Sequence, residues 1–183
     1  MVLIGRLERI PAGFSPSDYL VSSDSLVRRE AVKMLLRDPE ARETTVMTAL
    51  ADEDDRVVFM GLTAAQEKTP PGASDLMRQR VDLGELDSQL RTMCIRIVAQ
   101  QRGPKTLEWL LGHVVTESRW PRRPKLRSAT PEMLAALSMI AAGWSNAPAA
   151  ATALKLAARS KQAEVRAKLT RARASEQKGS ASS

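Results

Sequence analysis

The stretch that decides the fold is Asp24-Ser25-Leu26-Val27-Arg28-Arg29-Glu30-Ala31-Val32-Lys33-Met34-Leu35. From Val27, apolar or small residues recur at Ala31, Met34 and Leu35, which is the i, i+4, i+7, i+8 spacing of one helix face. The small side chain of Ala31, at the centre of this face, allows a neighbouring helix to approach closely. The stretch therefore predicts an amphipathic helix that packs tightly against another helix.

The same pattern returns further along the chain. Segments that begin at Val57 and Leu90 follow the preceding one by 30 and 33 residues, with Gly61 and Cys94 at the small position. Other apolar stripes predict second helices between these first ones. The full set of predicted helices is 27–35, 44–51, 57–62, 74–81, 90–98, 107–114, 133–141, 149–158 and 164–169. A repeat of this length predicts an all-α stack of helical hairpins.

Composition and helix-boundary signals agree with an all-α fold. Hydrophobic residues make up 43% of the 183 residues but aromatic residues only 3%, so aliphatic side chains must fill the core. The pairs Asp38-Pro39, Gly103-Pro104 and Thr130-Pro131 each predict a helix start, because a capping residue precedes a proline at the first helical position. Acidic residues 52–55 are expected to cap the helix at 57–62, and Asn146 the helix at 149–158.

The pattern Asp-x-x-Val-Arg-x-x-Ala-x-x-x-Leu at Asp24–Leu35 resembles the first helix of a HEAT repeat. The resemblance covers residues 22–174 and implies a right-handed α-solenoid of four to five HEAT-like hairpins, with the second helices lining a concave surface. On this interpretation residues 1–21 form an N-terminal capping segment, the repeat domain carries an insertion at about 116–129, and residues 175–183 form a disordered tail. HEAT arrays hold many unrelated partners, so the resemblance implies no substrate.

The net charge of +7 is distributed unevenly along the chain. Residues 1–118 carry 15 Lys/Arg and 18 Asp/Glu, a net charge of −3. Residues 119–183 carry 13 Lys/Arg and 3 Asp/Glu, a net charge of +10. This asymmetry predicts an acidic partner for the C-terminal third; the alternative is a basic tail that only aids solubility.

The densest basic cluster lies at 119–127, where two prolines keep the segment out of a helix and hold it extended. Arginine side chains there can bind phosphates or carboxylates in a two-pronged geometry, and Trp120 can stack on a base or anchor in a protein pocket. The alternative is a connecting loop with solvated charges, in which Trp120 covers a gap between repeats. The candidate partner-binding residues are Arg119, Trp120, Arg122, Arg123, Lys125 and Arg127.

The sequence predicts no catalytic, metal or cofactor site. His113 is the only histidine, Cys94 falls at a core-facing position, and there is neither a His/Cys cluster nor a Gly-rich phosphate loop. Some HEAT-like solenoids resemble alkylpurine DNA glycosylases, but the residues required here do not match that family's motif. Those residues would be Glu108, Trp109, Trp120 and Trp144. A maturation factor similar to the HEAT-like bilin lyases is a further alternative, supported by the repeat alone.

The single cysteine excludes an internal disulfide framework, and charged residues at Arg6, Glu8 and Arg9 stand where a signal peptide needs an apolar run. We therefore expect a soluble, cytoplasmic protein, with binding to a membrane surface left open. The predicted function is a non-catalytic scaffold or adaptor that binds a protein partner, with the basic loop and the C-terminal third facing an acidic surface. Nucleic-acid binding is the alternative, and the chain is a candidate subunit of a larger assembly.

Overall fold

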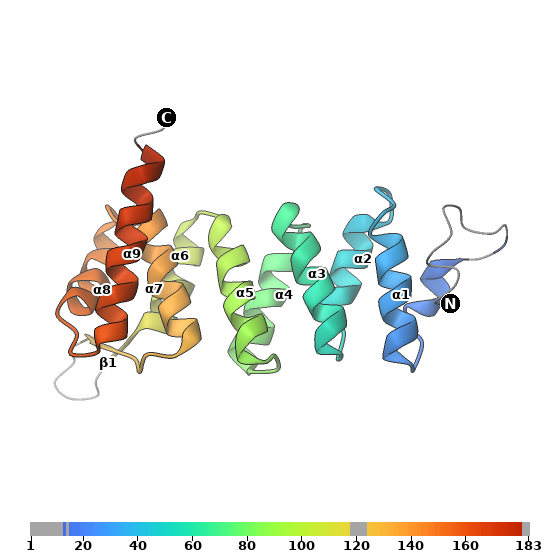
Figure 1. The fold of residues 1–183 in the computed structure, drawn as a ribbon, viewed down its shortest axis with the longest axis horizontal. Helices are drawn as coiled ribbons and strands as arrows, with labels where there is room; N and C mark the ends of the chain where they lie inside the picture. Colours follow the sequence, from blue (N-terminus) through green and yellow to red (C-terminus); the bar gives the residue numbers. More distant parts are fainter. Residues whose placement is uncertain (1–12, 14, 118–123, 181–183) are drawn as a thin grey trace. The chain divides into compact units, whose positions relative to one another are not determined.

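The computed structural model describes residue 13, residues 15–117 and residues 124–180, with the side chains of 175–180 left undescribed. The chain divides into two compact units, Met1–Leu90 and Arg91–Ser183, called unit 1 and unit 2. Helices dominate both units (Figure 1), which confirms the predicted all-α class for the described residues. No helix in these ranges combines the length and the apolar character needed to cross a membrane.

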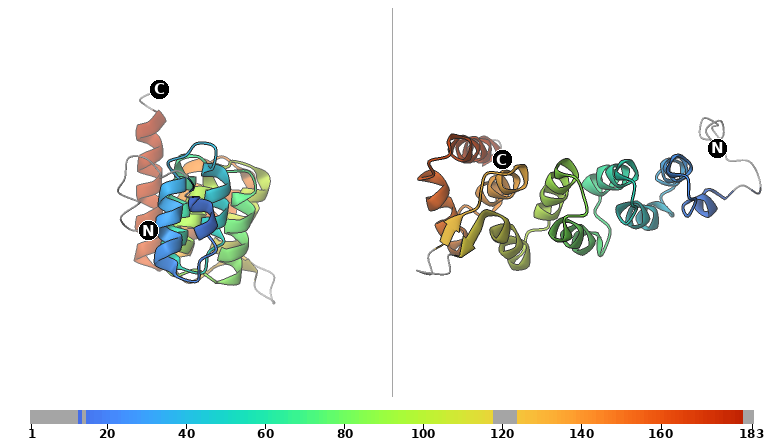
Figure 2. Two further views of the ribbon diagram at one scale, coloured as in Figure 1. Left: turned by 90° about the vertical axis from the view of Figure 1, so that its right-hand side faces the viewer. Right: turned by 90° about the horizontal axis from the view of Figure 1, so that it is seen from below.

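Unit 1 is built from four α-helices in two layers, preceded by a short 3-10 helix that packs on α1. Helices α1 and α3 lie in one layer, and α2 and α4 lie in the other (Figure 2, right). The core forms where α2 packs on α3 and α3 on α1, around the buried Val32, Ala49 and Val57. The elements are η2 (Pro16–Tyr19), α1 (Ser25–Leu35), α2 (Arg42–Leu50), α3 (Asp55–Glu67) and α4 (Ala73–Leu83).

Unit 2 contains the remaining helices and one short hairpin. Helix α7 packs against both α6 and α9, and α8 packs against α9 and the second hairpin strand. In Figure 1, α7 and α9 lie side by side, with α6 and α8 behind them. The elements are α5 (Ser88–Gln100, which begins in unit 1), α6 (Pro104–Val114), β1 (Val115–Glu117), β2 (Pro124–Leu126), α7 (Pro131–Gly143), α8 (Pro148–Ala158) and α9 (Ala163–Ser180).

Each predicted helix is present. The main difference from the prediction is a β-hairpin at the predicted insertion, where the sequence predicted no strand. Its strands β1 and β2 pair antiparallel, with Thr116 opposite Lys125. At the C-terminus α9 continues to Ser180, into the range where the sequence predicts a disordered tail. The predicted division into a capping segment, a repeat domain and a tail stays a prediction.

Three of the predicted helix caps are confirmed, one of them being Asp54 of the acidic run at the start of α3, and two are wrong. Gly103 and Thr130 are N-caps, each followed by proline, and the Thr130 side chain accepts a hydrogen bond from the Met133 amide. Asp38 instead closes a local turn by accepting from the Glu40 amide, and α2 begins only at Arg42. The predicted cap Asn146 lies one residue too early, because Ala147 is the N-cap of α8.

Gly61 confirms that a small residue brings α3 close to α2. A Cβ atom built on Gly61 would lie 3.0 Å from the Ala49 Cβ and 3.1 Å from the Leu50 backbone nitrogen. Those distances are shorter than ordinary van der Waals contacts, and backbone cannot yield as a flexible side chain can. The close packing of α2 on α3 therefore depends on the absence of a side chain at this position.

We expect Gly61→Ala to destabilise the protein although alanine is the better helix former. Overpacking against α2 should cost about 1–3 kcal/mol, which exceeds the gain of about 1 kcal/mol from helix propensity. The matched control is Gly112→Ala in α6, where nothing lies within 4 Å of the added Cβ, so stability should rise. Denaturant unfolding measures both variants, and a stabilising Gly61→Ala would contradict the described packing.

Candidate functional site

The structure describes two of the six predicted partner-binding residues. Lys125 lies exposed on β2, and Arg127 directly follows this strand. The Arg127 amide donates to the Val114 carbonyl at 2.9 Å, and its Nε donates to the Val115 carbonyl at 3.4 Å. Arg127 therefore ties the hairpin to the end of α6. The other four candidates, Arg119, Trp120, Arg122 and Arg123, lie outside the described residues.

Exposed basic side chains extend beyond this loop over α8 and α9. Strand β2 packs on α8, and α8 packs on α9, so cations on these three elements belong to neighbouring parts of one unit. Lys155 and Arg159 are four residues apart, and Arg166 and Arg173 are seven apart, so the members of each pair lie on the same side. All four side chains are exposed. We call this set the basic surface, and its members are Lys125, Lys155, Arg159, Lys161, Arg166 and Arg173.

Few carboxylates offset the basic surface. Unit 2 carries 17 Lys/Arg and 5 Asp/Glu, a net charge of +12, whereas unit 1 carries 11 and 16, a net charge of −5. Within the described part of unit 2, Glu132 pairs with Arg91 at 2.9 Å, and no member of the basic surface forms an ion pair. Arg166 donates to the Ser160 carbonyl and so joins the start of α9 to the preceding turn. The other five members of the basic surface are exposed to solvent.

Unit 1 offers a different kind of surface, centred on Phe59 in α3. The Phe59 side chain is 46% exposed, and together with Met60 it lines two grooves of about 350 Å³ each. The charges along the groove between α1 and α3 are already neutralised, because Arg42 pairs with Glu67 and Lys33 with Glu30. These grooves lie on the layer of α1 and α3, not on the second helices that the HEAT resemblance assigned to recognition.

The acidic run 52–55 has a structural role that the sequence predicted only in part. Asp54 caps α3 by accepting from the amides of Arg56 and Val57, as expected of this run. Asp52 instead forms a two-pronged ion pair with Arg28, with Nε–Oδ2 and Nη2–Oδ1 distances of 2.8 Å. Arg28 also donates to the Ser22 carbonyl at 2.8 Å. This network joins the start of α1 to the turn between α2 and α3.

The charges of this network are held by hydrogen bonds rather than by solvent, since both side chains are only 8% exposed. Burial by itself would raise the pKa of Asp52, but the hydrogen bonds from Arg28 and the Asp54 amide hold it below its usual value. The hydrogen bond with Asp52 raises the pKa of Arg28 in turn, against the effect of burial. Asp52 is ionised near neutral pH and supports the fold.

The residues considered for catalysis are spread over three helices. Cys94 lies on α5, Glu108, Trp109 and His113 lie on α6, and Trp144 is the C-cap of α7, whereas Trp120 lies outside the described residues. Cys94 is 1% exposed, which confirms its predicted place in the core. The His113 ring meets the Trp109 ring edge-on, with centroids 4.7 Å apart, and both are partly buried on α6. Glu108, beside them in sequence, is exposed. Among the described residues no group of three or more His, Cys, Asp or Glu side chains is placed to hold a metal ion.

No family model matches this sequence, and neither a curated protein nor a solved structure matches it.

Proposed function

We propose that this chain is a right-handed HEAT-like α-solenoid that acts as a non-catalytic scaffold and holds an acidic partner on the basic surface of unit 2. Support for the solenoid comes from the 30- and 33-residue spacing of the first helices and from the two-layer packing of helices within unit 1. In such arrays each hairpin buries one face against its neighbours and leaves an outer face free for recognition.

The observation that carries the binding proposal is the unpaired charge of the basic surface. Six exposed cations on β2, α8, the α8–α9 turn and α9 have no carboxylate partner among the described residues. Folded chains usually intersperse charges of both signs, so a surface of one sign attracts a ligand of the opposite sign. An acidic protein and a nucleic acid both meet this requirement, and the scaffold needs no catalytic group to hold either.

The test compares two charge-reversal variants with the same change in net charge. The basic-surface variant is Lys155→Glu, Arg159→Glu, Arg173→Glu, and the control in unit 1 is Lys33→Glu, Arg37→Glu, Arg56→Glu; all six residues are exposed. Immobilised poly-L-glutamate and immobilised duplex DNA serve as the two acidic ligands. The basic-surface variant should elute at clearly lower salt than the wild type from at least one of them, and the control should elute nearly as the wild type does.

Equal elution of the two variants would mean that net charge alone governs retention, and the proposed binding surface would be wrong. The same conclusion follows if the wild type is retained on neither ligand. Circular dichroism of each variant confirms that helix content is kept, so that a loss of retention is not a loss of fold.

A further inference from the structure

We infer that the ligand of the basic surface is the phosphate backbone of double-stranded nucleic acid, an inference that rests on the proposed function. The first observation is that the described part of this surface has no exposed large hydrophobic side chain. The large hydrophobic side chains that are exposed in the described chain all lie in unit 1, and they are Tyr19, Val21, Leu26, Phe59 and Leu83. The described part of unit 2 exposes none.

This absence separates the two classes of acidic ligand. Protein interfaces draw most of their affinity from a few anchors in well-packed pockets at the centre of the contact, most often Trp, Tyr and Arg, and the anchors are commonly aromatic. A phosphate backbone needs no such anchor, because the release of counterions by Lys and Arg supplies the binding free energy. The described cations of unit 2 have no exposed large hydrophobic side chain among them, and such a surface fits a phosphate backbone better than it fits a protein.

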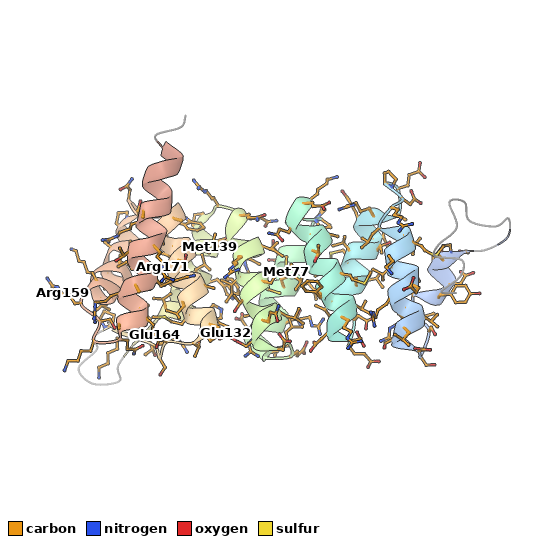
Figure 3. The ribbon with its side chains drawn as sticks, viewed as in Figure 1. Met77, Glu132, Met139, Arg159, Glu164 and Arg171 are labelled. Atoms are coloured by element: carbon orange, nitrogen blue, oxygen red, sulfur yellow. The ribbon has the colours of Figure 1, made fainter. Side chains whose placement is uncertain are left out.

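The arrangement of the cations fits an extended ligand. Arg166 and Arg173 lie on one stripe of α9, about 10 Å apart along the helix axis, with the small Thr170 between them. Lys155 in α8 and Arg159, which directly follows this helix, are four residues apart, and Figure 3 shows Arg159 pointing away from the helices. Because each duplex strand carries a phosphate about every 3.4 Å along its axis, such stripes can meet several phosphates of one backbone.

The carboxylates of unit 2 whose side chains are described lie off these stripes. Glu164 precedes Arg166 by two residues, so the helical turn places it on nearly the opposite side of α9. Glu132 lies at the start of α7, where Figure 3 labels it, and it forms an ion pair with Arg91. Among the carboxylates with described side chains, none therefore lies on the stripe of Arg166 and Arg173.

The basic surface favours a duplex over a single strand, and we expect it not to distinguish one base sequence from another. Binding to single strands depends on aromatic side chains that stack on bases. The two described tryptophans of unit 2, Trp109 and Trp144, are both partly buried, and Trp109 packs edge-on against His113. Phosphate contacts position a protein on a duplex without distinguishing base pairs. We therefore expect similar affinity for duplexes of unrelated sequence.

Fluorescence anisotropy with two labelled duplexes of unrelated sequence tests this inference across a salt series from about 50 to about 200 mM. Six neutralised phosphates predict a slope of log K against log salt of about −5. The Lys155→Glu, Arg159→Glu, Arg173→Glu variant should show a slope smaller in magnitude by about 3 and at least about tenfold weaker binding at low salt. The Lys33→Glu, Arg37→Glu, Arg56→Glu control should keep the wild-type slope, and the two duplexes should bind alike.

A parallel titration with labelled poly-L-glutamate and with a single strand of the same sequence separates the possible failures. If the wild type binds polyglutamate or the single strand more tightly than the duplex, and the basic-surface variant loses that binding, the duplex inference is wrong while the proposed function stands. If the wild type binds none of these ligands, or if both variants bind every ligand as the wild type does, the inference and the proposed function are both overturned.

Discussion

Replacing Arg28 with alanine should lower the free energy of unfolding by about 3–5 kcal/mol, the usual cost of removing one partner of a buried ion pair. The variant leaves Asp52 buried without its two-pronged partner, and it leaves the Ser22 carbonyl without the donor it has in the wild type. The expected loss is a large fraction of the stability of an ordinary domain. Denaturant unfolding followed by circular dichroism measures it.

The matched control is Arg37→Ala, an exposed arginine just beyond the same helix, which should change stability by less than about 0.5 kcal/mol.

A second check of the Arg28–Asp52 ion pair measures stability as a function of pH. Because the pKa of Asp52 is lower in the folded chain than in the unfolded chain, the stability it contributes is complete above about pH 4 and is lost as the pH falls further. The difference between wild type and Arg28→Ala should therefore narrow in acid. A difference that stays constant with pH would show that Arg28 acts through packing alone.

The second large effect is expected from Leu137→Ala in unit 2. Leu137 is 0% exposed on α7, the helix that packs against both α6 and α9. Truncation removes buried methyl groups and leaves a cavity beside α7, at a cost of about 2–5 kcal/mol. Hydrogen exchange should speed up in α7 and in α6 and α9, the two helices that pack on it.

Thr170→Ala, an exposed substitution in α9, is the control for Leu137→Ala and should leave exchange unchanged. A small loss of stability from Leu137→Ala, close to that of the control, would mean that α7 does not fill the centre of unit 2.

Periodicity predicted the helices because each of them buries one face, and burial at every third or fourth residue is visible in the sequence. Gly61 and Cys94 were identifiable as close-packed or buried positions for the same reason. Local signals were less reliable at helix starts. Asp38-Pro39 has the composition of a cap, but its carboxylate is used in a turn, and the choice between turn and cap depends on how α2 packs.

Interactions between residues distant in sequence could not be predicted. Arg28 and Asp52 are 24 residues apart, and the sequence offered a capping role that suited Asp52 equally well. The basic character of the C-terminal third was evident from charge counts alone. Charge counts do not show which of these cations lie on the surface. That depends on which sides of α8 and α9 are buried, and the structure shows that the exposed ones include Lys155, Arg159, Arg166 and Arg173. The two strands of the β1–β2 hairpin pair with each other across the insertion, and neither strand has a sequence pattern that predicts it.

The central claim is that the basic surface of unit 2 holds an acidic ligand. The most direct measurement is backbone NMR of the full chain during titration with a short duplex at moderate salt, with residue-by-residue assignment. We expect shifts concentrated at β2, the second half of α8, the α8–α9 turn and the Arg166–Arg173 stripe of α9, with α1 and α3 unchanged. Shifts confined to unit 1, or no shifts at a duplex concentration that saturates other basic proteins, would contradict it.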